Sequence, residues 1–212
     1  MARAVLTTPR KSASQKRSQA TVETLLDATA RVLVREGYDR ASTNRIAAVA
    51  GVSIGSLYQY FPGKEALVTA LVARHNREML ELLRGAMATV ATLRVGEAVR
   101  LLVAAMIEAH RIDPELHRIF DEQVPRMGQL AGIEAIEQET FALVRAFFDA
   151  RRDEITVRDL DTATYICVTS VETLTHDFVI RRPDASAAEQ AEMAGEITRL
   201  LVGYLEPTDR AA

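Results

Sequence analysis

The sequence predicts an all-α protein in two parts, and three observations predict it. Apolar residues recur at three- and four-residue steps in every long segment, which is the period of an amphipathic helix. No turn dipeptide of the hairpin type stands between alternating runs of apolar and polar residues, so strand signals are missing. The charge is also divided, because residues 1–75 hold eleven Arg or Lys and five Asp or Glu, whereas residues 76–212 hold fifteen and twenty-four. We therefore expect a basic N-terminal part and a larger, acidic helical body, with no internal repeat.

Composition limits the class of protein. With 212 residues, 48% of them hydrophobic and 26% charged, the chain is long enough for a small and a larger domain with ample core. Its one cysteine, Cys167, cannot form an internal disulfide, so nothing ties the chain to an oxidising compartment. No apolar run approaches the roughly 18 residues that span a bilayer, and the basic N-terminus lacks the apolar core of a signal peptide. We expect a cytoplasmic protein without a membrane partner.

The charge distribution points to a partner. A net charge of −3 argues against general affinity for nucleic acid. A basic head on an acidic body is nevertheless typical of a DNA-reading domain joined to a domain that does not bind DNA. Chance clustering of the basic residues is the alternative.

Residues 1–17 are predicted to be a basic flexible arm. The arm is polar, carries five Arg or Lys, and contains Pro9, which disfavours helix. It is either a tail without contacts or an arm that touches phosphates or the minor groove beside the main site.

The first helix is predicted from Ser18 to Glu36, with Gly37 as its terminator. Its apolar face consists of Val22, Leu25, Leu26, Ala30 and Leu33.

The stretch 42–61 is predicted to be two short helices joined by a tight turn. Ser42 can cap the first helix, Gly51 can adopt the left-handed conformation that ends it, and Ser53 can cap the second. Leu57 and Phe61 are expected in the core. The remaining surface of the second helix is small, polar or aromatic, without the usual Glu or Lys. This arrangement is a helix-turn-helix, whose second helix can lie in a DNA major groove.

The rest of the chain is also predicted to be helical. Pro62 and Gly63 break the chain before a helix that starts at Lys64, and the helical pattern continues to near Thr92. Pro114 suits the first position of a short helix, with Asp113 as its cap. The other helices are expected at 95–111, 114–122, 133–152, 157–181 and 186–204, with a loop around Pro125 and Gly128.

The segment from Thr43 to Leu67 resembles the DNA-binding signature of the tetracycline-repressor (TetR) family of bacterial regulators. The Ala-Gly-Val turn, the Leu-Tyr-Gln-Tyr-Phe run and the following lysine stand at the family's spacing, and the resemblance covers residues 18–67. The rest of the chain resembles the family only in being helical and of suitable length. The resemblance implies a helix-turn-helix DNA-binding domain at 18–65 and an effector-binding and dimerisation domain at 66–212. It also implies a homodimer, an operator with two half-sites, and release of DNA when a small molecule binds.

The resemblance also assigns roles to residues of the motif. It implies that the starts of both motif helices lie against DNA, that Gln59 reaches a base edge, and that Lys64 binds phosphate. Hydroxyls and helix N-terminal N–H groups are good phosphate donors, and Gln pairs well with adenine. Two alternatives stay open: Arg45 is either a phosphate contact or a solvated charge, and Tyr60 either reaches phosphate or packs against the next helix. The predicted DNA-binding residues are Thr43, Asn44, Arg45, Ser53, Ile54, Gly55, Ser56, Tyr58, Gln59, Tyr60 and Lys64.

Dimerisation is expected on physical grounds too. A recognition helix of about seven residues is only about 10 Å long, so it addresses a few base pairs, and two copies are needed for useful specificity. The last two long helices are the best interface, because the first is apolar around much of its girth and the second carries an apolar stripe. These residues are Tyr165, Ile166, Val168, Thr169, Val171, Leu174 and Phe178, then Ile197, Leu200, Leu201 and Tyr204.

Polar or soft residues within the apolar helices are candidates for an effector site, and ordinary packing is the alternative for each. They are Met106, His110, Phe120, Met127, Phe147, Tyr165, Thr169, Glu172, Thr173 and His176. No metal and no cofactor are expected, because one cysteine and four scattered histidines form no ligand cluster. An enzyme is disfavoured, since the chain lacks a phosphate loop, paired catalytic motifs and di-metal spacing. The residues indicate a DNA-binding protein, and the resemblance implies that it is a ligand-responsive repressor. The main alternative is a DNA-binding regulator controlled by a protein partner.

Overall fold

A computed structural model describes residues 16–123 and 133–206 of the chain. Within these ranges every regular element is a helix and none is a strand, which confirms the predicted all-α fold. By packing, the chain divides into two compact units, residues 1–77 with 115–134 and residues 78–114 with 135–212. The functional boundary predicted between residues 65 and 66 stays a prediction. Most of the predicted arm and the loop around Pro125 and Gly128 lie outside the described residues.

The first unit is built around the helix-turn-helix. It contains α1 (Lys16–Arg40), α2 (Thr43–Ala50), α3 (Ile54–Tyr60), the beginning of α4 (Lys64–Thr89) and α6 (Pro114–Gln123). Gly37 in α1 has φ 75° and ψ 167°, so the helical backbone breaks at the predicted terminator and one more turn follows to Arg40. The core consists of side chains from α1, α2, α3 and α4, among them Leu25, Leu33, Ile46, Leu57, Phe61, Leu67 and Leu71.

Helix α6 has a position that the sequence did not predict. Its side chains Leu116, Ile119 and Phe120 are buried in the core of the first unit, although α6 follows α5 in the chain. Pro114 stands at its first position, as predicted.

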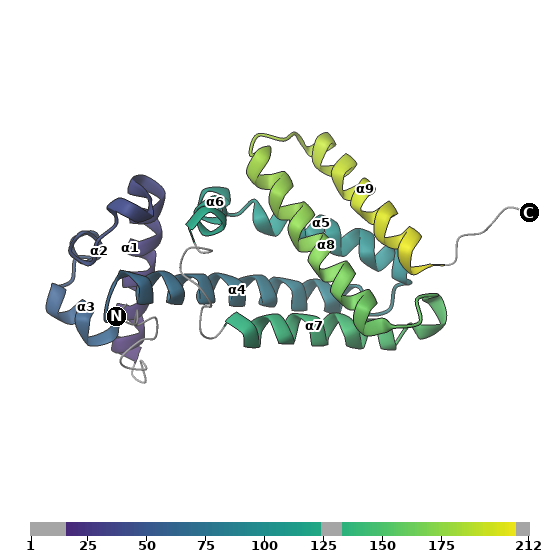
Figure 1. The fold of residues 1–212 in the computed structure, drawn as a ribbon, viewed down its shortest axis with the longest axis horizontal. Coiled ribbons are helices and arrows are strands. Elements are labelled where there is room, and N and C mark those ends of the chain that lie inside the picture. The colour runs from purple at the N-terminus through teal and green to yellow at the C-terminus, as the bar shows by residue number, and fades with distance from the viewer. Residues whose placement is uncertain (1–15, 124–132, 207–212) are drawn as a thin grey trace, which may run out of the picture. The chain divides into compact units, whose positions relative to one another are not determined.

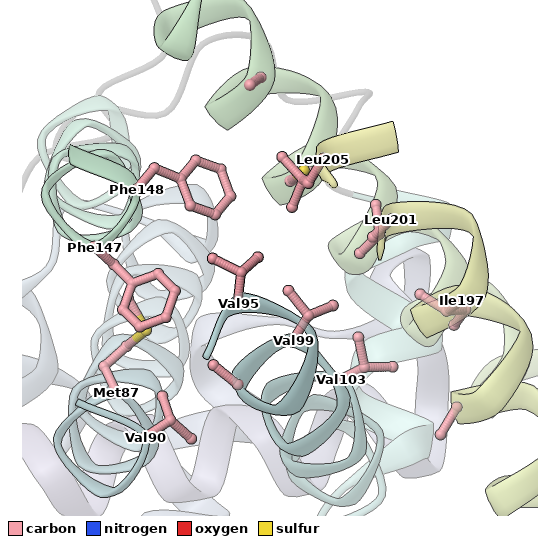
Figure 2. Packing of buried hydrophobic residues seen from close by; sticks show 14 of the residues in the cluster. Met87, Val90, Val95, Val99, Val103, Phe147, Phe148, Ile197, Leu201 and Leu205 are labelled. Atoms are coloured by element: carbon pink, nitrogen blue, oxygen red, sulfur yellow. The ribbon is translucent and has the colours of Figure 1, made fainter. Parts of the chain in front are cut away.

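The second unit is a helical bundle centred on α5 (Val95–His110). Helix α5 packs against α8 (Leu160–Arg181) and α9 (Ala187–Leu205) (Figure 1), and the end of α4 and α7 (Ile133–Asp149) contribute to the same core. Figure 2 shows the apolar row of α5 facing that of α9, with the start of α5 near the end of α9. The two rows are Val95, Val99 and Val103, and Leu205, Leu201 and Ile197.

Three helices are shorter than predicted by about three residues each. Helix α4 ends at Thr89 instead of Thr92. Helix α7 ends at Asp149 instead of residue 152, because a separate 3-10 turn, η2 (Arg152–Glu154), follows it. Helix α8 begins at Leu160 instead of residue 157, since the Asp159 carboxylate accepts the backbone N–H groups of the next turn.

Within the described ranges, no helix has both the length and the apolarity needed to cross a membrane.

The left-handed turn at Gly51 provides a stability test with an internal control. Gly51 has φ 68°, whereas Gly85 lies in the regular part of α4, and a Cβ added at either position would meet no neighbour within 4 Å. A Gly51→Ala variant should lower the free energy of unfolding by roughly 1–2 kcal/mol, because the left-handed conformation is strained for alanine. A Gly85→Ala variant should raise it by roughly 0.5–1 kcal/mol, because alanine favours helix. Urea unfolding curves measure both, and a loss of equal size in the two variants would contradict the assigned backbone strain.

Candidate nucleic-acid interface

The helix-turn-helix is held by three local caps. The Ser42 hydroxyl accepts a hydrogen bond from the backbone N–H of Arg45 at 3.2 Å, and that of Ser53 accepts from Ser56 at 3.0 Å. Gly51 ends α2 in the left-handed conformation, and its N–H is bonded back to α2. The structure therefore confirms the predicted caps and turn, which fix how α3 leaves the turn.

Helix α3 has one buried and one exposed face. Leu57 is fully buried, whereas Ile54 and Tyr58 are 37% and 42% exposed. Gly55 and Gln59 are exposed beside them. The exposed face thus offers a branched apolar group, a phenol and an amide, which suit thymine methyl groups, phosphate oxygens and adenine.

A pair of hydroxyls joins the start of α2 to the middle of α3. The Tyr58 hydroxyl lies 3.1 Å from the Thr43 Oγ1, and either group can donate. Asn44, the next residue, is exposed. The N-terminal N–H groups of α2 lie in the same region, so hydroxyl and backbone donors converge where a phosphate could bind.

Tyr60 packs in the core in this structure. It is only 9% exposed, and its hydroxyl lies 2.9 Å from the hydroxyl of Ser18 on α1. Tyr60 is thus a core residue in this structure, and its hydroxyl partner belongs to α1 and not to the next helix. Ser56 is half-buried, and its hydroxyl lies 2.9 Å from that of Ser53.

Two predicted cations are already held by neighbours. The Arg45 guanidinium donates to the Glu36 carboxylate at 2.6 Å, while half of its side chain stays exposed. The Lys64 ammonium donates to the Tyr38 carbonyl oxygen at 2.8 Å and lies 4.0 Å from the centre of the Tyr38 ring. Burial, and then the charges of Glu65 and Asp39, raise the pKa of the Tyr38 phenol. Sequence reasoning missed both Glu36 and Tyr38, although the aromatic residue directly after Gly37 was a signal for an anchoring side chain.

Seven of the effector candidates lie on two packed helices of the second unit, α5 and α8. His110 is buried, its Nδ1–H donates to the Met106 carbonyl at 2.7 Å, and its ring centre lies 5.5 Å from that of His176. Burial lowers the pKa of His110, the hydrogen bond to Met106 raises it, and the neighbouring His176 lowers it further. Thr169 is half-buried on α8. The net effect lowers the pKa of His110, so burial favours the uncharged form of its ring.

Three other candidates on α8 are more exposed to solvent. Tyr165 is 60% exposed and stacks on Phe141 of α7, with ring centres 6.1 Å apart and an angle of 20° between the rings. Glu172 and Thr173 follow on the same helix and are exposed. Partial desolvation, more than the charge of Glu137, raises the pKa of the Glu172 carboxyl.

The remaining candidates are not grouped with these residues. Phe120 packs in the core of the first unit, with its ring centre 5.5 Å from that of His75. Phe147 lies in the core of the second unit under the Arg151 guanidinium, which is 3.9 Å from its ring centre. Met127 lies outside the described residues. Across residues 16–123 and 133–206, no three His, Cys, Asp or Glu side chains are grouped so that they could hold a metal ion.

Two stretches of the chain match described families. Residues 25–71 match "Bacterial regulatory proteins, tetR family", and residues 95–205 match "Tetracyclin repressor-like, C-terminal domain". A helix-turn-helix-type transcriptional regulator of Mycobacterium tuberculosis is 33% identical over 138 residues, which are 64% of each chain. The match thus spans less than two thirds of that relative's length.

Two solved structures share the fold. A TetR-family regulator from Mesorhizobium loti has a TM-score of 0.72 at 17% identity, over 91% of this chain and 100% of its own. The regulator FadR from Bacillus subtilis, solved in complex with stearoyl-CoA, has a TM-score of 0.70 at 19% identity, over 86% and 98%. With its capped helix-turn-helix and matches to both parts of the family, the chain belongs to the tetR family of bacterial regulatory proteins.

Proposed function

We propose that the protein is a homodimeric repressor that acts in the cytoplasm, binds an operator with two half-sites, and leaves it when a small molecule binds the second unit. The observation that carries this proposal is the face of α3: Leu57 is buried, while Ile54, Tyr58 and Gln59 point away from the core between two capped helix ends. A face of this kind reads base edges in the major groove.

The proposed DNA-binding residues fall into two groups. Thr43, Asn44 and Tyr58 would bind phosphates, since their polar groups lie with the N-terminal N–H groups of α2. Side chains at the start and middle of α3 would face the bases. Arg45 and Lys64 would reach phosphates by exchanging their present partners, Glu36 and the Tyr38 carbonyl. This second group, which would face the bases, comprises Ser53, Ile54, Gly55, Ser56 and Gln59. Tyr60 belongs to neither group, because it is buried in the core.

Helices α8 and α9 are the proposed dimer interface. Large apolar side chains are exposed on both helices, since Tyr165 is 60%, Leu174 38% and Leu200 58% accessible in a single chain. A second copy with the same surface would cover them by two-fold symmetry.

The proposed effector site uses the α5–α8 polar residues, in particular Met106, His110 and His176, with Thr169, Glu172 and Thr173 along α8. Apolar walls with a few hydrogen-bonding groups are typical of small-molecule sites. The complex of FadR with stearoyl-CoA supports a ligand within this fold and makes that compound a reasonable first probe.

Tyr58 and Tyr60 form a matched pair for testing the interface. A Tyr58→Phe variant should bind DNA about tenfold more weakly, because it loses a hydrogen bond to a charged phosphate. A Tyr60→Phe variant should keep wild-type affinity, since the Tyr60 hydroxyl bonds to Ser18 instead. Fluorescence anisotropy with one labelled duplex measures both, and circular dichroism checks that both fold. Equal losses in the two variants would rule out Tyr58 as a phosphate contact.

Selection of duplexes from a random pool should return an inverted repeat.

With a selected duplex as the parent site, a Gln59→Ala variant should lose about 1–3 kcal/mol of discrimination at one base pair per half-site, because the amide no longer pairs with adenine. Affinities for single-base variants of the duplex measure this. Unchanged selectivity at every position would remove Gln59 as a base contact.

The purified wild-type protein also serves to test the proposed homodimer. Sedimentation at micromolar protein should give the mass of two chains, and the mass of one chain there would contradict the proposed homodimer.

Release by a small molecule is tested against control by a protein partner. A thermal-shift panel of hydrophobic and amphipathic compounds, with stearoyl-CoA among them, should contain a ligand that raises the melting temperature and releases the selected duplex. Coenzyme A without an acyl chain is the matched control. If no compound does either while DNA binding is intact, control by a protein partner replaces the small-molecule proposal.

A further inference from the structure

The first turns of the described helices differ in charge. Each α-helix from α4 to α9 has an acidic residue in its first turn, which suits the positive end of the helix dipole. Helices α1, α2 and α3 have none there. The starts of α2 and α3 border the proposed DNA-binding face, so they have no anion of their own where phosphates would bind.

Arg45 increases the positive charge at the start of α2. It lies in the first turn of that helix, and its backbone N–H donates to the hydroxyl of the N-cap residue, Ser42. A cation at this end of a helix is opposed by the helix dipole. The compensating anion comes from α1, because the Arg45 Nε donates to the Glu36 Oε1 at 2.6 Å.

Glu36 is placed equally unfavourably in its own helix. Gly37 has a non-helical backbone, so the regular part of α1 ends at Glu36. A carboxylate at the C-terminal end of a helix is opposed by the helix dipole. Because α1 and α2 pack against each other, the two unfavourable charges meet and each compensates the other.

The second cation of the proposed interface is held in a different way. The Lys64 ammonium contacts the Tyr38 carbonyl and the Tyr38 ring, and these partners carry no charge. The Arg45 guanidinium is instead neutralised for as long as Glu36 stays bonded to it. The side chain of Arg45 is 51% exposed and that of Glu36 26%, so a phosphate can reach the guanidinium.

We infer that Glu36 is an internal competitor of DNA phosphate for Arg45 and thereby limits the affinity for DNA. The Arg45 guanidinium would turn from Glu36 to a phosphate, because an exposed ion pair is weak enough to exchange and arginine forms charge-assisted hydrogen bonds with phosphate. Binding then gains less from Arg45 than from a cation without an internal partner. The inference rests on the proposed function in one respect, namely that Arg45 faces DNA phosphate.

A Glu36→Gln variant of the full-length protein tests the competitor on the selected duplex. The change removes the charge and keeps the shape, so Arg45 is available to phosphate before DNA binds. The affinity should rise about 1.4- to fivefold per half-site, which is the range that an exposed ion pair contributes, and by the square of that factor for two half-sites. Fluorescence anisotropy measures the affinity. A folding defect would lower the affinity, so it cannot imitate this result.

Glu23→Gln is the matched control. It removes the same charge from the same helix, and the Glu23 carboxylate bonds to the Arg74 Nη1 at 2.9 Å. Arg74 keeps a second carboxylate, that of Asp27, at 2.8 Å. The affinity should stay within about twofold of the wild type, because Glu23 holds no cation of the proposed interface and salt screens its longer-range effect.

An Arg45→Ala background separates competition from general repulsion. The Glu36 charge repels phosphate with or without Arg45, whereas competition requires Arg45. Glu36→Gln should therefore raise the affinity more in the wild-type background than in Arg45→Ala, and a double-mutant cycle measures the difference.

Equal gains in the two backgrounds would overturn the competitor, and so would the absence of any gain in the wild-type background. Failure of the wild type to bind any duplex is a different result, because it would contradict the proposed DNA-binding function itself.

Discussion

Every helix leaves unpaired N–H groups at its start and unpaired carbonyls at its end, and the pairing of these groups organises both units of this chain. In the first unit, Ser42, Gly51 and Ser53 pair them within a few residues and thereby fix the angle between α2 and α3. In the second unit, Glu154 pairs the first N–H of α5, and Arg151 binds carbonyls of the turn after α4, in both cases across some sixty residues of sequence. The short-range caps create the surface that we propose reads DNA, and the long-range bonds tie the turn after α4 to the bundle.

This difference in range explains what could be predicted from the sequence. A cap that bonds three residues ahead, such as Ser53 to Ser56, is visible in the sequence because both partners belong to one pattern. The helical period likewise predicted that Leu57 is buried, because a short helix with one apolar anchor has one possible inner face. The fold class and the reading face of α3 follow from such local rules.

Contacts between distant segments could not be predicted in this way. Nothing near Tyr60 in the sequence indicates Ser18, and nothing near Arg151 indicates Leu93. The position of α6 is the largest such case, because its apolar face fits either unit and only the fold places Phe120 beside His75. The candidate effector residues therefore lie in different parts of the structure. The sequence selected them by residue type, whereas their positions depend on how the helices pack.

The two cations of the proposed DNA interface already have partners within the protein. Arg45 and Lys64 are held by Glu36 and by the Tyr38 carbonyl, so each must give up an existing interaction to bind phosphate. Such an exchange yields less net free energy than a cation taken from water, because the lost partner offsets part of the gain. We therefore expect the geometry-dependent donors to carry a larger share of the proposed DNA binding. These donors are the Tyr58 and Thr43 hydroxyls, the Gln59 amide and the start of α2. A chain of net charge −3 can then bind DNA selectively, because alignment of these donors with one surface contributes more than general attraction to phosphate.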